Sequence, residues 1–308
     1  MTRVFIDGSA GTTGLRIRER LADREDLELI ILPEEVRKDP SARADALNSS
    51  DVSFLCLPDA AAVEAASFVT DPDTVIIDTS TAHRVADGWI YGMPELAGQR
   101  EKLKVAQRIA NPGCHATGFI SLVAPLVASG LIRRDARLSC FSLTGYSGGG
   151  KKMIAEYEAP ETDPLYQAPR QYALGQAHKH LPEMAKLCGL DHAPVFSPIV
   201  APYYAGMEVT VPLTPDLTSA SVEEIRGAYR AYYRDGLIRF AESPDEGGFL
   251  SAGAFAGRDD LEVSVFGNEE RILLVSRFDN LGKGASGAAI QNMNLVLGLE
   301  EEKGLNVK

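Results

Sequence analysis

Short apolar runs alternate with helical patterns along the first third of the chain. The runs expected to form strands are Val4–Ile6, Leu27–Leu32, Val52–Leu57, Val75–Ile77 and Val105–Ile109. Between them, segments 14–22 and 60–69 place their apolar residues at helical spacing. Strands that are apolar on both faces and separated by helices are typical of a parallel sheet covered on both sides. The pattern therefore predicts an α/β fold with a doubly wound parallel sheet.

The pattern changes after residue 112, which indicates a domain boundary. Helices are predicted for residues 115–128, 221–234 and 286–297, and strands for residues 138–143, 207–213, 261–266 and 272–277. The last three strands alternate partly between apolar and polar residues, as in an antiparallel sheet with one open face. Residues 158–170 are expected to form a loop, and residues 300–308 a loose end. A second, α+β domain with a mainly antiparallel sheet is thus predicted.

Composition and charge narrow the classes of function. The chain has 308 residues, 45% hydrophobic and 24% charged, which suits about two globular domains. Its net charge of −12 repels phosphate backbones and argues against a nucleic-acid partner. Neither a signal peptide nor an apolar run long enough for a membrane span is recognised. The four cysteines form no C-x-x-C pair, which favours reduced thiols in the cytoplasm.

A glycine-rich turn, Gly8-Ser9-Ala10-Gly11-Thr12-Thr13-Gly14, directly follows the first predicted strand. Glycines in such a turn let the backbone approach a pyrophosphate, and the following helix offers N–H groups and the positive end of its dipole. The spacing is G-x-x-G-x-x-G rather than the commoner G-x-G-x-x-G. The place of the turn between a strand and a helix favours a dinucleotide site over a plain connection.

The residues after the second strand leave the choice between NAD and NADP open. Glu34 and Glu35 lie roughly 20 residues past the glycines, where an acid can bind a ribose hydroxyl. Arg37 and Lys38 follow at once and could pair with a 2′-phosphate instead. All four would also suit a solvated loop.

A candidate nucleophile, Cys114, stands in the segment Asn111-Pro112-Gly113-Cys114-His115-Ala116-Thr117-Gly118. A Pro-Gly turn delivers this cysteine to the start of the apolar helix, where the dipole and N–H groups stabilise a thiolate and lower the thiol pKa. Cys56, Cys140 and Cys188 are expected to be small buried residues. A structural role is the alternative for Cys114 as well.

A histidine near the cysteine would be the expected acid or base, because imidazole is the commonest such partner. His115 adjoins Cys114, but on a helix its side chain would point about 100° away. His178 and His180, in the segment His178-Lys179-His180-Leu181-Pro182-Glu183, would share one face if that segment is extended. A metal held by both is the rival interpretation. No third ligand has a fitting spacing, so no metal is expected.

Two further segments carry groups suited to anions. The segment from Asp78 to Arg84 leaves the end of a predicted parallel strand, where open α/β sheets bind ligands, and Arg84 could clamp a carboxylate or phosphate. The segment from Ser147 to Lys152 combines backbone N–H donors with two lysines. A solvated arginine and a merely mobile loop are the alternatives.

A nucleotide-binding turn, one activated cysteine and a distant histidine together suggest hydride transfer to or from a thioester. The chain resembles the N-acetyl-γ-glutamyl-phosphate reductase family, in its shorter variant, over essentially the whole length. The resemblance rests on segments 8–14, 80–84, 91–95, 111–118, 147–151, 178–183 and 280–287. Residues 148–152 depart from the Gly-Ala-Gly-Arg pattern of longer homologues.

The resemblance implies a Rossmann-type NADP-binding domain (residues 1–112, completed by 283–308) and a catalytic and oligomerisation domain (residues 113–282). It implies NADPH-dependent reduction of N-acetyl-γ-glutamyl phosphate to N-acetylglutamate 5-semialdehyde in arginine biosynthesis, in the cytoplasm, by a homodimer or homotetramer. Cys114 would be the nucleophile and His178 the acid–base residue, although the residues alone leave the choice between His178 and His180 open. The implied substrate contacts are Arg84, Ser147, Gly148, Lys151, His180 and Glu183. The implied cofactor contacts are Gly8, Ser9, Gly11, Thr12, Thr13, Gly14, Arg37, Ser80, Asn280, Lys283 and Gly284.

Other functions fit parts of the same pattern. Aspartate-semialdehyde dehydrogenase would share the architecture and chemistry and differ in its substrate. A Cys–His acyl hydrolase or transferase would not need the glycine turn. A non-catalytic NADP-binding regulatory protein would carry an unreactive Cys114. The substrate and the reactivity of this thiol therefore separate the alternatives.

Overall fold

The computed structural model describes residues 1–244 and 246–308, and these form two compact units. The first unit comprises residues 1–112 and 285–305, and the second comprises residues 113–284 and 306–308. The chain thus leaves the first unit after residue 112, returns at residue 285, two residues later than the expected boundary at 283, and leaves again after residue 305. The last three residues join the second unit because Asn306 exchanges backbone and side-chain hydrogen bonds with Asp259.

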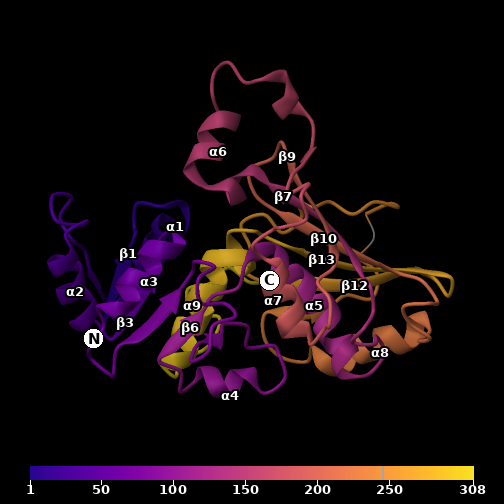
Figure 1. The fold of residues 1–308 in the computed structure, drawn as a ribbon, viewed down its shortest axis with the longest axis horizontal. Coiled ribbons are helices and arrows are strands. Elements are labelled where there is room, and N and C mark those ends of the chain that lie inside the picture. Colours follow the sequence, from indigo (N-terminus) through magenta and orange to yellow (C-terminus); the bar gives the residue numbers. More distant parts are fainter. Residues whose placement is uncertain (245) are drawn as a thin grey trace. The chain divides into compact units, whose positions relative to one another are not determined.

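The first unit is built on a six-stranded sheet of order β2-β1-β3-β4-β6-β5 (Figure 1). Every strand pair in it is parallel. The strands are β1 (Thr2–Asp7), β2 (Leu27–Ile30), β3 (Val52–Leu55), β4 (Val75–Asp78), β5 (Ile90–Tyr91) and β6 (Arg108–Ala110). The helices are α1 (Thr12–Leu21), α2 (Pro40–Asn48), α3 (Asp59–Ser67), α4 (Gln99–Leu103) and α9 (Gly287–Val296).

Alternation along the strands decides which helices cover which face of this sheet. Val4 and Ile6 pack with residues of α1 and α9, whereas Phe5 packs with residues of α2 and α3. Strand β3 is buried at every position, as expected between two layers of helices. The predicted doubly wound parallel sheet is therefore confirmed. Its carboxyl edge carries the glycine turn after β1 and Asp78 at the end of β4.

The second unit is built on a seven-stranded mixed sheet of order β11-β12-β13-β10-β7-β9-β8. The strands are β7 (Ser139–Gly145), β8 (Arg170–Gln171), β9 (Val195–Ala201), β10 (Met207–Leu213), β11 (Ile238–Phe240), β12 (Leu261–Asn268) and β13 (Arg271–Phe278). The helices are α5 (Cys114–Ala128), α6 (Gly150–Tyr157), α7 (Leu181–Cys188) and α8 (Val222–Tyr232). Two 3₁₀ turns, η1 (Tyr146–Gly149) and η2 (Pro164–Gln167), and a π-helical turn, η3 (Gly282–Ser286), complete it. Most strand pairs are antiparallel, but β7–β9 and β11–β12 are parallel.

Helix α5 forms the centre of the second unit's core. It is buried from His115 to Leu126 because it packs against one face of the mixed sheet. The approach is closest at Gly118, where a Cβ atom would lie 2.4 Å from Cγ2 of Val209. Ser276 Oγ also donates a hydrogen bond to the carbonyl of Gly118. The sheet therefore fixes the position of the helix whose first residue is Cys114.

Several segments differ from the sequence prediction. The fifth strand is Arg108–Ala110 rather than 105–109, and Val105 is 82% exposed in the preceding turn. Residues 147–152 run through η1 into α6 instead of forming an open loop, and the loop predicted at 158–170 contains η2. The expected loose end is held, since Glu301 pairs with Arg100 at 2.6 Å. None of the helices in the described ranges is long and apolar enough to cross a membrane.

Candidate active site

The glycine turn of the first unit is shaped for a close-lying ligand. Gly8 has a φ of +85°, and a Cβ atom there would lie 2.3 Å from the carbonyl oxygen of Cys56. A Cβ atom at Gly14 would lie 2.5 Å from the carbonyl oxygen of Gly8, so both positions require glycine. Gly11 caps α1 without a side-chain hydrogen bond, which leaves N–H groups of the first turn for a ligand.

Thr12 gives a second indication that the glycine turn binds a ligand. Its Oγ1 is buried and has no hydrogen-bond partner among the described residues. A buried hydroxyl without a partner is costly unless a ligand or water completes it. The turn, which also includes Ser9 and Thr13, therefore fits the pyrophosphate of a dinucleotide.

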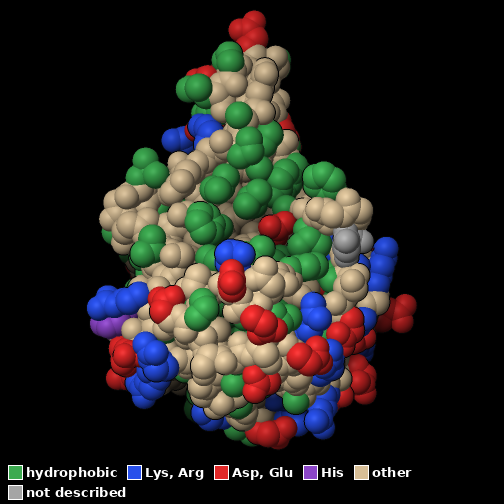
Figure 2. Space-filling model, turned by 90° about the vertical axis from the view of Figure 1, so that its right-hand side faces the viewer, with side chains coloured by type: hydrophobic (Ala, Val, Ile, Leu, Met, Phe, Trp, Pro, Cys, Tyr) green, Lys and Arg blue, Asp and Glu red, His purple; other side chains and the backbone are tan. Residues whose placement is uncertain are grey.

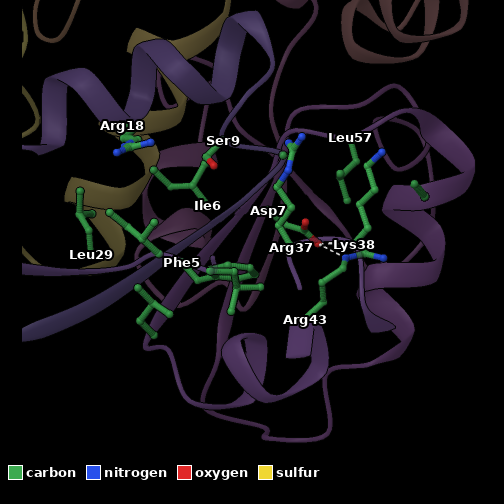
Figure 3. Close-up of a pocket in the computed structure, with 15 residues that line it drawn as sticks. Phe5, Ile6, Asp7, Ser9, Arg18, Leu29, Arg37, Lys38, Arg43 and Leu57 are labelled. Atoms are coloured by element: carbon green, nitrogen blue, oxygen red, sulfur yellow. Dashed lines mark hydrogen bonds and ion pairs between the residues drawn. The ribbon is translucent and has the colours of Figure 1, made fainter. Parts of the chain in front are cut away.

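A cavity of about 260 Å³ adjoins the turn (Figure 3). Its walls are apolar side chains of β1 and β2, and its charged lining is Arg18, Arg37, Lys38 and Arg43, with Asp7. Arg43 is paired with Asp7 at 2.9 Å and with Glu64 at 3.2 Å. Burial raises the pKa of Asp7, which Arg43 opposes. Arg18, Lys38 and Arg37, the last of which pairs with the exposed Glu34, add positive charge that would attract an anion into the cavity.

Glu34 and Glu35 do not line this cavity. The Glu34 carboxylate is 76% exposed and pairs with Arg37 at 2.5 Å. Arg18 was not a predicted site residue, although it lies four residues after Gly14 and hence on the same face of α1. The sequence signal that could have identified it is this helical spacing from the glycine turn.

Asp78 organises the carboxyl end of β4. It is fully buried and accepts hydrogen bonds from the N–H and the hydroxyl of Ser80 at 2.9 and 2.7 Å. His83 Nδ1 lies 2.6 Å from the same carboxylate, and its ring stacks on Trp89. The hydroxyl of Ser80, an expected cofactor contact, is thus directed at Asp78.

Arg84 is buried rather than solvated. Its Nε donates to the carbonyl of Asn111 at 3.0 Å, and Nη2 donates to the carbonyl of Thr79 at 3.1 Å. The guanidinium therefore ties the end of β4 to the segment that leads into Cys114. The expected clamp of Arg84 on a substrate anion stays a prediction.

Cys114 is the first residue of α5, with Gly113 as the N-cap. The N–H of Gly113 donates to Oε2 of Glu183 at 3.2 Å, and no side chain caps the helix. A Cβ atom at Gly284, in η3, would lie 2.9 Å from the Cβ of Cys114, so glycine lets η3 approach the cysteine. A thiolate at this position is stabilised by the dipole and the first-turn N–H groups.

The other three cysteines are unsuited to act as nucleophiles. Burial raises the pKa of Cys56 to about 12. Burial also raises the pKa of Cys140 and Cys188 far above the usual thiol range. Cys114 is half-buried and is the cysteine that begins a helix. Cys140 and Cys188 are buried as predicted, whereas Cys56 is half-buried.

Three histidine rings gather near Cys114. The ring of His178 lies 4.6 Å from that of His180 and 5.6 Å from that of His115, between centroids. His178 and His180 stand in a turn, so the condition of an extended segment, under which they would share one face, is not met. His180 is buried, with Nε2 4.0 Å from Oε1 of Glu183, whereas His178 is half-buried. The four residues Cys114, His178, His180 and Glu183 are therefore brought to one site in the second unit.

The backbone fixes the tautomer of His178. The N–H of His180 donates to Nδ1 of His178 at 3.1 Å. A neutral imidazole that accepts at Nδ1 carries its hydrogen on Nε2. His178 is therefore arranged as a hydrogen-bond donor at Nε2.

Sequence reasoning missed a hydrogen-bonded chain at this site. His115 Nδ1 lies 2.6 Å from Oγ of Ser142, and His115 Nε2 lies 2.6 Å from the hydroxyl of Tyr172. Burial, and to a lesser extent repulsion from His178 when that ring is protonated, lowers the pKa of His115 to about 3. Burial and then the charge of Cys114 raise the pKa of Tyr172. No local motif marks Ser142 or Tyr172, since both reach the site only through the mixed sheet.

The remaining predicted contacts differ in their surroundings, and two of them form hydrogen bonds within the protein. Asn280 donates to Oγ of Ser147 at 2.9 Å and accepts from the N–H of Gly206. The N–H of Ser147, expected to bind an anion, instead donates to the carbonyl of Tyr204 at 3.0 Å. Gly148 and Lys151 are exposed, and Lys283 is buried in η3. Within residues 1–244 and 246–308, no group of three His, Cys, Asp or Glu side chains is arranged to hold a metal ion.

Comparison with known proteins identifies the families that the chain matches. Residues 32–106 match the family described as semialdehyde dehydrogenase, NAD binding domain, and residues 114–280 match semialdehyde dehydrogenase, dimerisation domain. The chain is similar in fold to aspartate semialdehyde dehydrogenase II of Vibrio cholerae, with a TM-score of 0.70, 18% identity and coverage of 97% and 99% of the two chains. It is also similar to aspartate semialdehyde dehydrogenase with NADP from Candida albicans, with a TM-score of 0.68, 14% identity and coverage of 97% and 99%.

Similarity in sequence is much higher to a narrower group. The chain is 46% identical to N-acetyl-gamma-glutamyl-phosphate reductase 2 of Nostoc sp., over 98% of this chain and 99% of that protein. It is 45% identical to N-acetyl-gamma-glutamyl-phosphate reductase of Burkholderia ambifaria, over 96% of both. The chain belongs to the N-acetyl-γ-glutamyl-phosphate reductase family of semialdehyde dehydrogenase-type oxidoreductases.

Proposed function

We propose that the protein reduces N-acetyl-γ-glutamyl phosphate to N-acetylglutamate 5-semialdehyde with NADPH, through a thioester on Cys114, as a step of arginine biosynthesis. The observation that carries the proposal is the half-buried Cys114 at the start of α5, beside the turn of His178. The 46% identity to a reductase named for this substrate supports the choice of acyl phosphate.

Cys114 acts as the nucleophile. Its thiolate attacks the γ-carbonyl carbon, a carbon–sulfur bond forms, and the carbonyl electrons move to oxygen. Collapse of this intermediate breaks the bond to the phosphate oxygen, which releases inorganic phosphate and leaves the thioester. After reduction, the hemithioacetal collapses with cleavage of the carbon–sulfur bond. This step yields the semialdehyde and regenerates the thiolate.

His178 stabilises the negative oxygen at each of these stages. Its Nε2–H is fixed by the hydrogen bond that Nδ1 accepts from His180. A positioned donor aimed at a developing oxyanion strengthens as the charge develops, which lowers the barrier. His180 and Glu183, which are buried beside Gly113, hold the two catalytic segments in place.

NADPH, when bound, supplies the hydride that reduces the thioester carbon. The turn of Gly8, Ser9, Gly11, Thr12, Thr13 and Gly14 would hold its pyrophosphate. Arg18, Arg37 and Lys38 would hold the 2′-phosphate, because Glu34 and Glu35 lie outside the cavity and Asp7 is paired with Arg43. Lys283 and Gly284 remain proposed contacts of the nicotinamide half, and Ser80 and Asn280 would act by shaping their turns.

Arg37→Ala should weaken NADPH without weakening NADH. Loss of one charge-assisted hydrogen bond costs about 1.5–3 kcal/mol, or roughly 10- to 150-fold in Kd. Fluorescence titration with the two reduced cofactors measures the difference. Glu34→Gln is the matched control, because it releases Arg37 from its ion pair and should leave NADPH binding unchanged or tighter. An equal loss for NADH and NADPH would show that Arg37 does not contact the 2′-phosphate.

The reaction can be tested in reverse. Purified protein would receive NADP⁺, phosphate and N-acetylglutamate 5-semialdehyde, with aspartate semialdehyde in parallel. Phosphate-dependent NADPH formation with the acetylated compound alone is the expected result. Formation with aspartate semialdehyde instead would retain the mechanism and change the substrate. Binding of NADP⁺ without turnover of either compound would favour a regulatory protein.

A second copy of this chain is the proposed protein partner. Phe141, Val195 and Leu273 are 46%, 62% and 41% exposed and lie on the face of the mixed sheet opposite α5. Figure 2 shows a surface region in which hydrophobic side chains gather. Such patches on isolated chains mark interaction sites. The match of residues 114–280 to a dimerisation domain supports a homodimer or homotetramer, and a reduced Cys114 suits the cytoplasm.

Phe141→Glu should dissociate this oligomer. A charge placed in an apolar contact between two copies would be buried without a partner. Sedimentation velocity at micromolar concentration should show a dimer or larger species for the wild type and a monomer for the variant. Val105→Glu, at an exposed residue of the first unit, is the control and should leave the oligomer intact. A monomeric wild type would contradict the proposal.

A further inference from the structure

We propose that Tyr172 is a further catalytic residue, whose hydroxyl donates a hydrogen bond to the oxygen of the acyl group bound to Cys114. This inference rests on the proposed function and adds a second donor to that of His178. Its basis is the chain of hydrogen bonds Ser142–His115–Tyr172 in the second unit.

This hydrogen-bonded chain has a buried end at Ser142 and an accessible end at Tyr172. Ser142 and His115 are 0% and 3% exposed, whereas Tyr172 is half-buried. Both contacts are 2.6 Å long, from Ser142 Oγ to Nδ1 and from Nε2 to the Tyr172 hydroxyl. The His115 ring also lies 5.6 Å from that of His178, so the accessible end of this hydrogen-bonded chain faces the histidine turn beside Cys114.

The donor and acceptor in each of these two hydrogen bonds follow from the protonation state of His115 and from the acceptor available to Ser142. His115 stays neutral because its pKa is lowered to about 3, so its ring carries one hydrogen. Nδ1 of His115 is the acceptor that the described structure provides for the Ser142 hydroxyl. Ser142 therefore donates to Nδ1, and Nε2–H donates to the oxygen of Tyr172. The reverse order would leave a buried hydroxyl hydrogen without an acceptor.

This order leaves the hydrogen of the Tyr172 hydroxyl for another acceptor. The phenol stays protonated at neutral pH, since burial and the charge of Cys114 raise its pKa. The Tyr172 ring lies 5.8 Å from that of His178, which places the phenol beside the proposed acid–base residue. The oxygen that becomes negative during attack and reduction is the acceptor that suits this donor.

Tyr172 is held before any substrate arrives. Its N–H donates to the carbonyl of Pro198 at 3.1 Å. Four residues later, the Gln176 side chain donates to the carbonyl of Phe196 at 2.7 Å and accepts its N–H at 2.9 Å. This clamp holds Ala173 and Gln176 at φ values of 52° and 53°, which non-glycine residues rarely adopt. The segment from Tyr172 to His178 is therefore pinned to β9, and the rings of these two residues lie 5.8 Å apart.

Tyr172→Phe tests the donor, because it removes the hydroxyl and keeps the ring. In the reverse assay with N-acetylglutamate 5-semialdehyde, kcat should fall about 100-fold, as for loss of one oxyanion donor. The KM for the semialdehyde and the Kd for NADP⁺ should change little. Tyr203→Phe is the matched control, since Tyr203 is in the same unit and its buried hydroxyl has no hydrogen-bond partner among the described residues. It should keep the wild-type kcat.

Ser142→Ala gives a second test without altering the tyrosine. Without the serine hydroxyl, His115 is free to accept from Tyr172, and kcat should fall to a value between those of the wild type and Tyr172→Phe. A Tyr172→Phe variant that keeps the wild-type kcat would overturn the role of Tyr172 and leave the proposed function standing. A wild type that produces no NADPH from the semialdehyde would overturn the proposed function and this inference with it.

Discussion

Cys114→Ser is expected to abolish phosphate-dependent NADPH formation, with a fall in kcat of at least about 10⁴-fold, the scale of a lost nucleophile. A serine hydroxyl is not ionised at neutral pH, so the helix N-terminus that stabilises a thiolate gives it no comparable advantage. NADP⁺ binding should persist, because the glycine turn and its cavity belong to the first unit. The coupled measurements are the reverse assay and a fluorescence titration with NADPH.

Cys188→Ala is the control for this variant. Cys188 is buried at the end of α7, and its raised pKa excludes a thiolate, so turnover should be retained. Near-normal turnover of Cys114→Ser would show that no thioester forms there. A simultaneous loss of NADP⁺ binding would instead indicate general damage to the fold.

His178→Gln should lower kcat about 10²- to 10⁴-fold, the range for a positioned acid–base group. Glutamine fills a similar volume, and its amide N–H can donate near the position of Nε2, but the amide cannot give up or take up a proton as the imidazole does. The KM for the semialdehyde should change much less than kcat, because the contact strengthens only as charge develops on the substrate oxygen. Steady-state kinetics in the reverse direction measure both constants.

His180→Gln separates the two histidines that the sequence leaves open. His180 is buried next to Glu183 and begins α7, so its loss should lower the thermal midpoint more than that of His178→Gln. The smaller kinetic effect is expected for His180→Gln. If this variant were stable and inactive while His178→Gln remained active, the two roles would be exchanged.

The fold was largely predictable where a local pattern and the tertiary environment agree. Strand β10 was predicted with its observed limits, since every second residue from Met207 to Leu213 is buried. Helix α2 was missed because the side chains it buries include Arg43, which leaves no continuous apolar stripe. Helix α6 was missed because it begins beside three glycines and buries none of its residues. Burial of a charge or exposure of a whole helix is decided by tertiary contacts that the pattern does not contain.

The same distinction between local pattern and tertiary contact explains which site residues could be predicted from the sequence. Cys114, His178 and the glycine turn are marked by motifs that act through local backbone geometry, namely a helix start, a turn and a strand–helix connection. Arg84 and Asn280 stand in equally clear motifs, but the structure assigns their side chains to carbonyls, amides and hydroxyls of the protein itself. Tyr172 and Ser142 come together only because β8 and β7 both pair with β9. Long-range strand register of this kind has no signature in one sequence.

The crossings between the units after residues 112 and 284 have a consequence for how this architecture can be rebuilt. Asn111 donates to the carbonyl of Ala285 at 3.0 Å, so the ends of the first unit lie side by side where the second unit departs and returns. Gly284 and Cys114 are likewise in contact within the second unit. The second unit is thus an inserted domain, and the residues at which the chain enters and leaves it lie side by side. A short linker from Pro112 to Ala285 would close the nucleotide-binding unit, and an inserted domain from another family member could be grafted at the same junction.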